Sequence, residues 1–264
     1  MDSSFARRRG LRWVVIAGLL SSTCAGQPAN IASTSTAEVG QIVTQLVNNN
    51  EARAAQLQHY EGCREYKIDY AGFPSNKSAA MVVSMEYTAP AEKRFQVLRE
   101  EGPKLLVSKV LKELLATEKE ASGEEHRKAT ALTPDNYEFR FAGNDTLNGR
   151  PQFMLDVMPR TRSKYLYQGR VWVDATDYAV SRIQAQPAKN PSFWISHTEI
   201  EHDYMKVGEF WLPARNVSIT KVRLGGTATL KIHYENYVIG KQHGLSLSEV
   251  CSNIAGQTNT AERR

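Results

Sequence analysis

The chain has 264 residues, of which 41% are apolar and 23% are charged, and its formal net charge is +5. These values are typical of a soluble domain with a core of its own, and they exclude a disordered tail or a fibre. The mean hydropathy is −0.44 and the only dense apolar run lies near the N-terminus. Several membrane-spanning helices are therefore excluded, since each needs roughly 20 apolar residues.

Residues 1–26 have the pattern of a cleaved secretory signal peptide. Four arginines precede an apolar run over residues 13–20, and small residues follow up to Gly26, so that cleavage after Ala25 or Gly26 is acceptable. An uncleaved membrane anchor is an alternative, as is lipidation at Cys24. Export to the periplasm is the localisation that this pattern predicts.

Removal of the signal peptide changes the charge of the chain. Because residues 1–26 hold four Arg and one Asp, the net charge of +5 falls to about +2. No block of Lys and Arg with interleaved aromatic residues is present, so nucleic acid is not expected as a partner.

Export also bears on the cysteines. Cys63 and Cys251 are the two that remain in the exported chain, and an oxidising compartment permits a disulfide between them. Two free buried thiols are the alternative. Their wide spacing gives little support to a redox or zinc role.

The first element expected after a flexible lead over residues 27–36 is an amphipathic helix over residues 38–60. Its apolar residues, among them Val39, Ile42 and Leu46, recur at helical spacing, and residues 48–50 are three asparagines where a kink is expected. A second helix is expected over residues 104–120, after Pro103, with an apolar stripe that dissolves into a charged run up to Lys128.

The rest of the chain has the period-two alternation of antiparallel strands with one buried face. Turn residues separate about ten or eleven such strands between residues 65 and 239. We expect an α+β fold with a single curved antiparallel sheet and helices against its concave face. It forms one domain, residues 37–250, followed by a C-terminal tail, residues 251–264.

The alternation predicts which side chains line the concave face. They are Tyr66, Ile68, Met81, Val83, Met85, Phe95, Phe139, Leu155 and Tyr165. The second helix is expected to cover them with Leu106, Val110, Leu111 and Leu114.

Signatures of catalysis are missing, since the sequence has no GxSxG, Walker A, HExxH or GxGxxG motif, and we expect neither an enzyme nor a cofactor. His197, Glu199, Glu201 and Asp203 would share one face of a strand, with His202 on the other, a spacing that suits a metal site. The opposite face carries Thr198, Ile200 and Tyr204, so we interpret the charged face as the solvated one and expect no metal. Asp174 and Asp177 are interpreted as turn residues rather than a catalytic pair.

Phe193 and Trp194 follow Asn190-Pro191-Ser192, in what should be a loop. Core packing is one interpretation, and a rim that touches a lipid or a partner is the other.

Several segments together resemble a known family. They include NYEFRFAG from Asn136, a W-V-D strand and hairpin from Arg170 to Tyr178, KNPSFWI from Lys189, and the W-L-P strand at residues 211–213. With the order of helices and strand pairs, they resemble the periplasmic outer-membrane lipoprotein-sorting (LolA-like) superfamily over most of residues 37–240.

The resemblance implies a half-open β-barrel that holds acyl chains of lipids or lipoproteins in transit through the periplasm, and a role in envelope lipoprotein sorting. Envelope membrane proteins are further partners that it implies. It also implies a functional Arg at the cavity mouth, which the sequence does not identify. The fold is similar to the sensor domain of RseB/MucB-type regulators, so an envelope-stress sensor or interaction module without transport activity is the alternative.

Overall fold

The computed structural model describes residues 36–120, 123–190, 192–223, 225–240 and 247–252. They belong to one of two units of the chain, Thr34–Arg264, whereas the other unit, Met1–Ser33, lies outside them. The predicted signal peptide, residues 27–35 of the predicted lead and residues 253–264 of the predicted tail thus lie outside the described residues.

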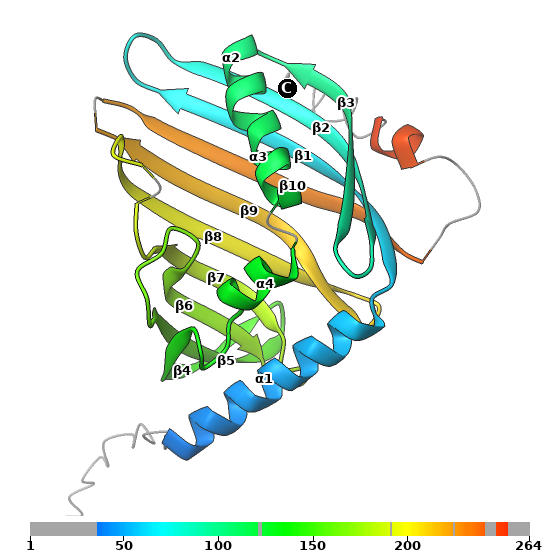
Figure 1. Ribbon diagram of the computed structural model, residues 1–264, viewed down its shortest axis with the longest axis vertical. Helices are drawn as coiled ribbons and strands as arrows, with labels where there is room; N and C mark the ends of the chain where they lie inside the picture. The colour runs from blue at the N-terminus through cyan, green and yellow to red at the C-terminus, as the bar shows by residue number, and fades with distance from the viewer. Residues whose placement is uncertain (1–35, 121–122, 191, 224, 241–246, 253–264) are drawn as a thin grey trace, which may run out of the picture. The chain divides into compact units, whose positions relative to one another are not determined.

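Ten antiparallel strands form one curved sheet that is not closed, with β3 and β4 as its edges (Figure 1). The spatial order is β3-β2-β1-β10-β9-β8-β7-β6-β5-β4. The strands are β1 (His59–Ala71), β2 (Lys77–Thr88), β3 (Glu92–Glu101), β4 (Tyr137–Leu147), β5 (Arg150–Pro159), β6 (Tyr167–Asp174), β7 (Val180–Pro187), β8 (Ile195–Val207), β9 (Phe210–Val222) and β10 (Thr227–Ile239). The predicted fold class is confirmed.

The register places one row of directly paired residues across nine of these strands, from β2 to β4. The row runs Met81, Tyr66, Ile232, Asn216, His202, Ile183, Val171, Leu155 and Phe141. Since paired residues point to the same side of a sheet, this row marks the concave face.

Helix α1 (Thr36–Gln56) covers the β4–β7 half of that face. It buries Val39, Ile42, Val43 and Leu46 on one stripe, as the helical spacing predicts, and it continues without a break through residues 48–50. Its predicted end at residue 60 was wrong. His59 already begins β1, because the backbone there pairs with β2 and β10.

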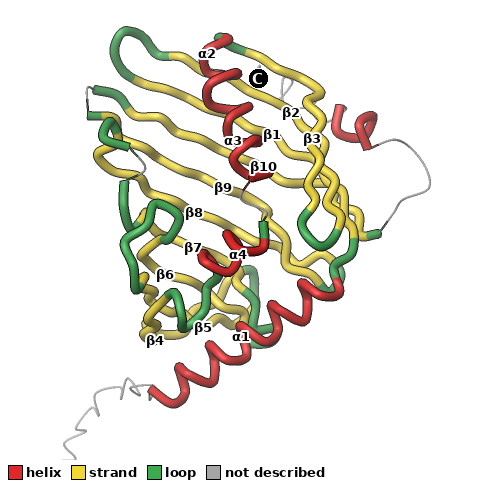
Figure 2. Tube along the Cα trace, viewed as in Figure 1, coloured by secondary structure: helices red, strands yellow, loops and turns green. Residues whose placement is uncertain are grey.

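A second helical cover lies over β1, β2, β3 and β10 (Figures 1 and 2). It consists of α2 (Lys104–Leu106), the π-helical segment η1 (Val107–Leu111) and α3 (Lys112–Glu120), which follow one another without interruption. We call these residues 104–120 the lid helix. A further short helix, α4 (Glu124–Thr130), occupies part of the charged run into which the second helix was expected to dissolve.

The opposite face of the sheet is covered near β1 and β2 by a helix over residues 247–252. Cys251 of this helix forms a disulfide with Cys63 of β1, with a Cα–Cα distance of 5.4 Å, inside the range of roughly 4.4–6.8 Å that disulfides occupy. Both cysteines are buried with Val82. Among the described residues, no helix is both long and apolar enough to cross a membrane.

Candidate functional site

The lid helix closes the part of the concave face that β1 and β2 provide. Leu111 is 0% exposed, and it packs in one cluster with Tyr66, Ile68, Met81 and Val83. Phe95 of β3 is partly buried against the same cluster. Five of the nine side chains predicted to line the face therefore lie directly beneath the lid helix.

The remaining predicted side chains do not join them. Phe139 and Leu155 belong to the cluster under α1, and Met85 packs with Tyr60 and Leu212. The expectation for Tyr165 was wrong, since it lies in a turn before β6 and is 52% exposed. The concave face thus carries two apolar areas, one under each helical cover, and a third cluster around Met85.

The buried stripe of the lid helix is shifted from the predicted one. Val107, Leu111 and Leu115 are buried, whereas the predicted Leu106, Val110 and Leu114 are only partly buried beside them. Val107 and Leu111 lie in the π-helical segment and are four residues apart, a spacing that places both on the buried side of the helix.

The side chain that sequence reasoning missed is Arg64, which is only 3% exposed. It alternates with Glu65 and shares the concave face with Tyr66 and Ile68, so that its guanidinium lies beneath the lid helix. The distance from Arg64 Cζ to the ring centroid is 5.2 Å for Phe95 and 5.0 Å for Tyr234. In the sequence, the alternation that Arg64 shares with Tyr66 and Ile68 was the one indication that its side chain points to the buried face of the strand.

Arg64 binds the lid helix by a two-point ion pair with Glu118 of α3. Nη1 donates to Oε2 at 2.6 Å and Nη2 donates to Oε1 at 3.1 Å, while Lys93 Nζ of β3 also donates to Oε1 at 2.7 Å. Burial opposes the charge of Glu118, but Arg64 and Lys93 outweigh it and lower the pKa of the carboxyl to about 2. The lid helix is therefore held by an apolar stripe, by the ion pairs of Glu118 with Arg64 and Lys93, and by a further ion pair of Lys112 with Glu100 of β3 at 2.6 Å.

Between the two apolar areas, the concave face is polar. Thr198 and His202 of β8 lie opposite Thr220 and Asn216 of β9. The two threonine hydroxyls are 3.1 Å apart and hydrogen-bonded. Burial lowers the pKa of His202 to about 4, against the opposing charges of Asp203 and Glu118, so the imidazole is neutral at pH 7.

The charged side of β8 pairs with its neighbours on the outer face. Arg182 Nε lies 2.5 Å from Asp203 Oδ1, Arg215 contacts both Glu201 and Asp203, and His197 lies 3.1 Å from Glu199. These acidic groups are engaged by basic side chains rather than converging on a common point. Asp174 accepts from the backbone N–H groups of residues 176 and 177, the arrangement of a turn residue.

One cluster that could hold a metal ion was not foreseen. Ligand atoms of His59, Glu61 and Glu86 lie within 4.8 Å of one another, because β1 and β2 place the two glutamates directly opposite. His59 is already engaged with Glu61 at 3.2 Å and Thr88 at 3.3 Å, and Arg94 lies 3.8 Å from Glu86. The residues come from two strands whose register the sequence does not reveal.

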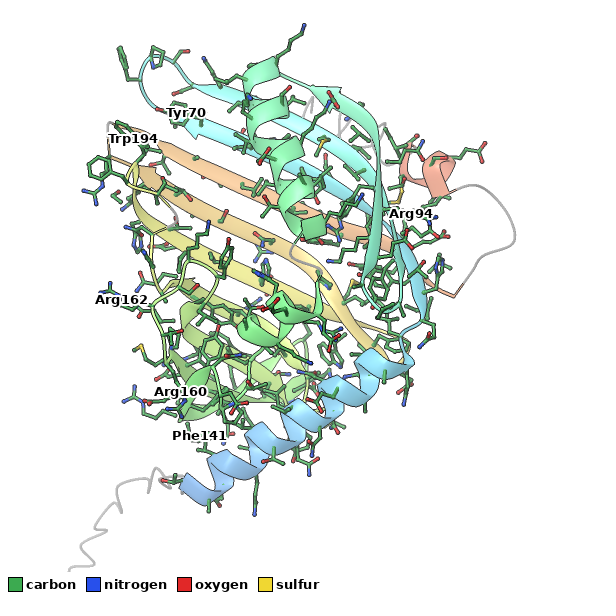
Figure 3. The ribbon with its side chains drawn as sticks, in the orientation of Figure 1. Tyr70, Arg94, Phe141, Arg160, Arg162 and Trp194 are labelled. Carbon is green, nitrogen blue, oxygen red and sulfur yellow. A yellow bond between two sulfur atoms is a disulfide. The ribbon has the colours of Figure 1, made fainter. Side chains whose placement is uncertain are left out.

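The loop before β8 carries two exposed aromatic side chains. Phe193 and Trp194 are 74% and 55% exposed, and the guanidinium of Arg223 lies 5.1 Å from the Phe193 ring centroid. Figure 3 shows Trp194 at the same end of the sheet as Tyr70. This position rules out core packing for the pair, and a role as a contact rim stays a prediction.

No protein-family model and no curated protein matches the sequence. Solved structures similar to this chain include a putative outer-membrane lipoprotein-sorting protein domain from Vibrio parahaemolyticus, with 11% identity, a TM-score of 0.38, and coverage of 81% of this chain and 98% of that one. A DUF1329 family protein from Desulfovibrio piger has 12% identity, a TM-score of 0.37, and coverage of 79% and 95%.

The LolA superfamily protein NE2245 from Nitrosomonas europaea has 10% identity, a TM-score of 0.31, and coverage of 78% and 94%.

Proposed function

We propose that the chain binds an acyl chain of a lipid or lipoprotein on the concave face, beneath the lid helix, and carries it in the periplasm. The observation that carries this proposal is the burial of Leu111 against Tyr66, Met81 and Val83. A helix whose stripe packs on an apolar sheet face can exchange these contacts for those of an acyl chain. Both gain about 25 cal/mol per Å² of apolar surface buried, so exchange needs little net free energy.

The ion pair of Glu118 with Arg64 and Lys93 is compatible with a lid helix that opens. Glu118 is 31% exposed at its side chain, so water can reach the ion pair with Arg64 and Lys93 from outside. An opened lid helix would leave Arg64 on the sheet and Glu118 in solvent. The methionines Met81 and Met85 suit a face that accepts varied chains, because the unbranched Met side chain adapts its shape.

The disulfide supports the proposed export and the proposed place of action. The disulfide between Cys63 and Cys251 is typical of proteins in oxidising compartments. N-terminal sequencing of the exported protein tests the predicted cleavage after Ala25 or Gly26. Retention of residues 1–26 or acylation of Cys24 would contradict it.

The test of binding is native mass spectrometry and lipid extraction of the purified protein, followed by titration with a fluorescent fatty acid. Leu111→Asp should abolish or strongly weaken probe binding, because it places a charge under the lid helix. Leu105→Asp is the matched control, since Leu105 lies on the same helix but is 63% exposed. If no lipid co-purifies and no acyl probe binds, the carrier proposal is wrong, and a sensor or interaction module takes its place.

A further inference from the structure

The row of paired residues across the concave face is interrupted at one place. Its members are aliphatic, aromatic or Met, except for Asn216 and His202, which pair directly on β9 and β8. On one side Asn216 adjoins Ile232 of the cluster under the lid helix, and on the other His202 adjoins Ile183 of the cluster under α1. The polar pair therefore lies between the two apolar areas and adjoins both of them.

Both side chains hold a buried polar atom without a partner. Among the described residues, three buried side-chain atoms form no hydrogen bond, and two of them are His202 Nε2 and Asn216 Oδ1. The third is Arg64 Nε, on the same face of β1. An unpartnered buried polar group destabilises a fold, whereas an apolar residue of the same shape would not.

The neighbouring pair on the same two strands shows that this arrangement is particular to Asn216 and His202. Thr198 and Thr220 lie four residues away on each strand and on the same face, yet their hydroxyls bond to each other. Polar residues that violate packing rules without compensation in the fold are expected at functional positions.

We propose that Asn216 and His202 form a recognition site for the hydroxyl of an uncharged lipid headgroup, of the acylglycerol class. The inference rests on the proposed acyl-chain binding and names the class of ligand. A hydroxyl has one proton and two lone pairs, so it can donate to Asn216 Oδ1 while it accepts a hydrogen bond from the protonated Nε2 of the neutral His202 ring. A fatty-acid carboxylate has no proton to donate, and it would meet the Asn216 oxygen as a second acceptor.

The headgroup would lie between the two apolar areas, while its acyl chain takes the place of the lid-helix contacts over β1 and β2. His202 is neutral at pH 7, so the site adds no charge to the face, in keeping with an uncharged ligand. Hydrogen bonds to this pair would satisfy groups that the lipid-free fold leaves unpaired.

The experiment compares two lipids that share an oleoyl chain and an ester, 1-oleoylglycerol and methyl oleate, in competition with the fluorescent fatty acid on the delipidated exported protein. We expect 1-oleoylglycerol to bind about tenfold more tightly, as one or two net hydrogen bonds allow. In the double variant His202→Leu, Asn216→Leu the ratio should fall to about one while methyl oleate keeps its affinity.

The control is Thr198→Val with Thr220→Val, which removes a satisfied pair from the same strands and should preserve the ratio. The single variant Asn216→Ala repeats the test with a smaller change if the double variant does not fold. In the absence of lipid, the double Leu variant should melt at a higher temperature than the natural protein. A ratio of one in the natural protein, or an unchanged ratio in the variants, would overturn the inference while methyl oleate binding upholds the carrier function. Failure of both lipids to bind would overturn both proposals.

Discussion

Arg64 of β1 and Glu118 of α3 are joined by two hydrogen bonds of 2.6 and 3.1 Å across the space between the sheet and the lid helix. Arg64 is nearly inaccessible to solvent, whereas Glu118 lies at the edge of the cover. Glu118 stabilises the buried charge of Arg64, because an uncompensated charge inside a protein is far more unfavourable than a paired one.

The first prediction concerns this pair. Glu118→Gln should lower the free energy of unfolding by roughly 2–3 kcal/mol, since it leaves the buried guanidinium of Arg64 without a counter-charge. The double variant Arg64→Met, Glu118→Gln should recover part of the loss. Urea denaturation followed by circular dichroism measures both.

Glu124→Gln is the control for the loss of one carboxylate. Glu124 pairs with Lys128 on the surface of α4, where water screens the charges, so little change is expected. Equal effects of the two Glu→Gln substitutions would show that the Arg64 contact adds nothing to the closed state.

The second prediction concerns the apolar stripe of the lid helix. Leu111→Ala removes a side chain that is 0% exposed, and should destabilise the protein by about 2–5 kcal/mol. Leu105→Ala removes an exposed side chain and should stay within roughly 0.5 kcal/mol. Hydrogen exchange should show faster opening of residues 104–120 in the first variant only. Unchanged protection there would mean that Leu111 does not hold the lid helix closed.

Most of the fold prediction rested on residue patterns within single helices and strands. The helical stripe at Val39, Ile42 and Leu46 and the alternation of Tyr66 and Ile68 each reflect burial of one face, and both appear in the structure as predicted. The same alternation included Arg64, but a charged residue at a buried position cannot be distinguished by sequence alone from one at an irregularity of the strand.

What the sequence could not reveal depends on the register between strands and on helix geometry. Asn216 and His202 become a pair only because β9 and β8 align them. The separation of the two apolar areas under the helical covers follows from where α1 and the lid helix lie. The π-helical turn at Val107–Leu111 has no distinct sequence signature. The side chains predicted to form one lining therefore lie in separate clusters, and their role in ligand binding stays a prediction.

The third prediction concerns the disulfide. The variant Cys63→Ala, Cys251→Ala should be less stable by about 4–5 kcal/mol, because the bond closes a loop across 188 residues of sequence separation in the unfolded chain. The helix over residues 247–252 should also become sensitive to proteases, since Cys251 tethers it to β1. Thiol titration of the non-reduced protein should find neither cysteine reactive. Two reactive thiols, or a variant as stable as the natural protein, would contradict the prediction.

The last prediction concerns pH and His202. Its pKa is about 4 in the folded protein and near the ordinary 6.5 in the unfolded chain, so between these values the unfolded chain binds more protons. Stability should therefore fall as the pH is lowered from 6.5 to 4, with a contribution from His202 of at most about 1.4 kcal/mol per pH unit. Glu118, whose pKa is lowered from 4.5 to about 2, acts in the same direction but in the lower window, between pH 4.5 and 2. Urea denaturation at pH 3, 4, 5, 6 and 7 in the natural protein and in His202→Leu separates the two groups. The difference between the two proteins should change steadily from pH 6.5 to 4 and then level off. A difference that is constant over this window would show that His202 titrates in the folded state as it does in the unfolded chain, and that the concave face leaves it open to water.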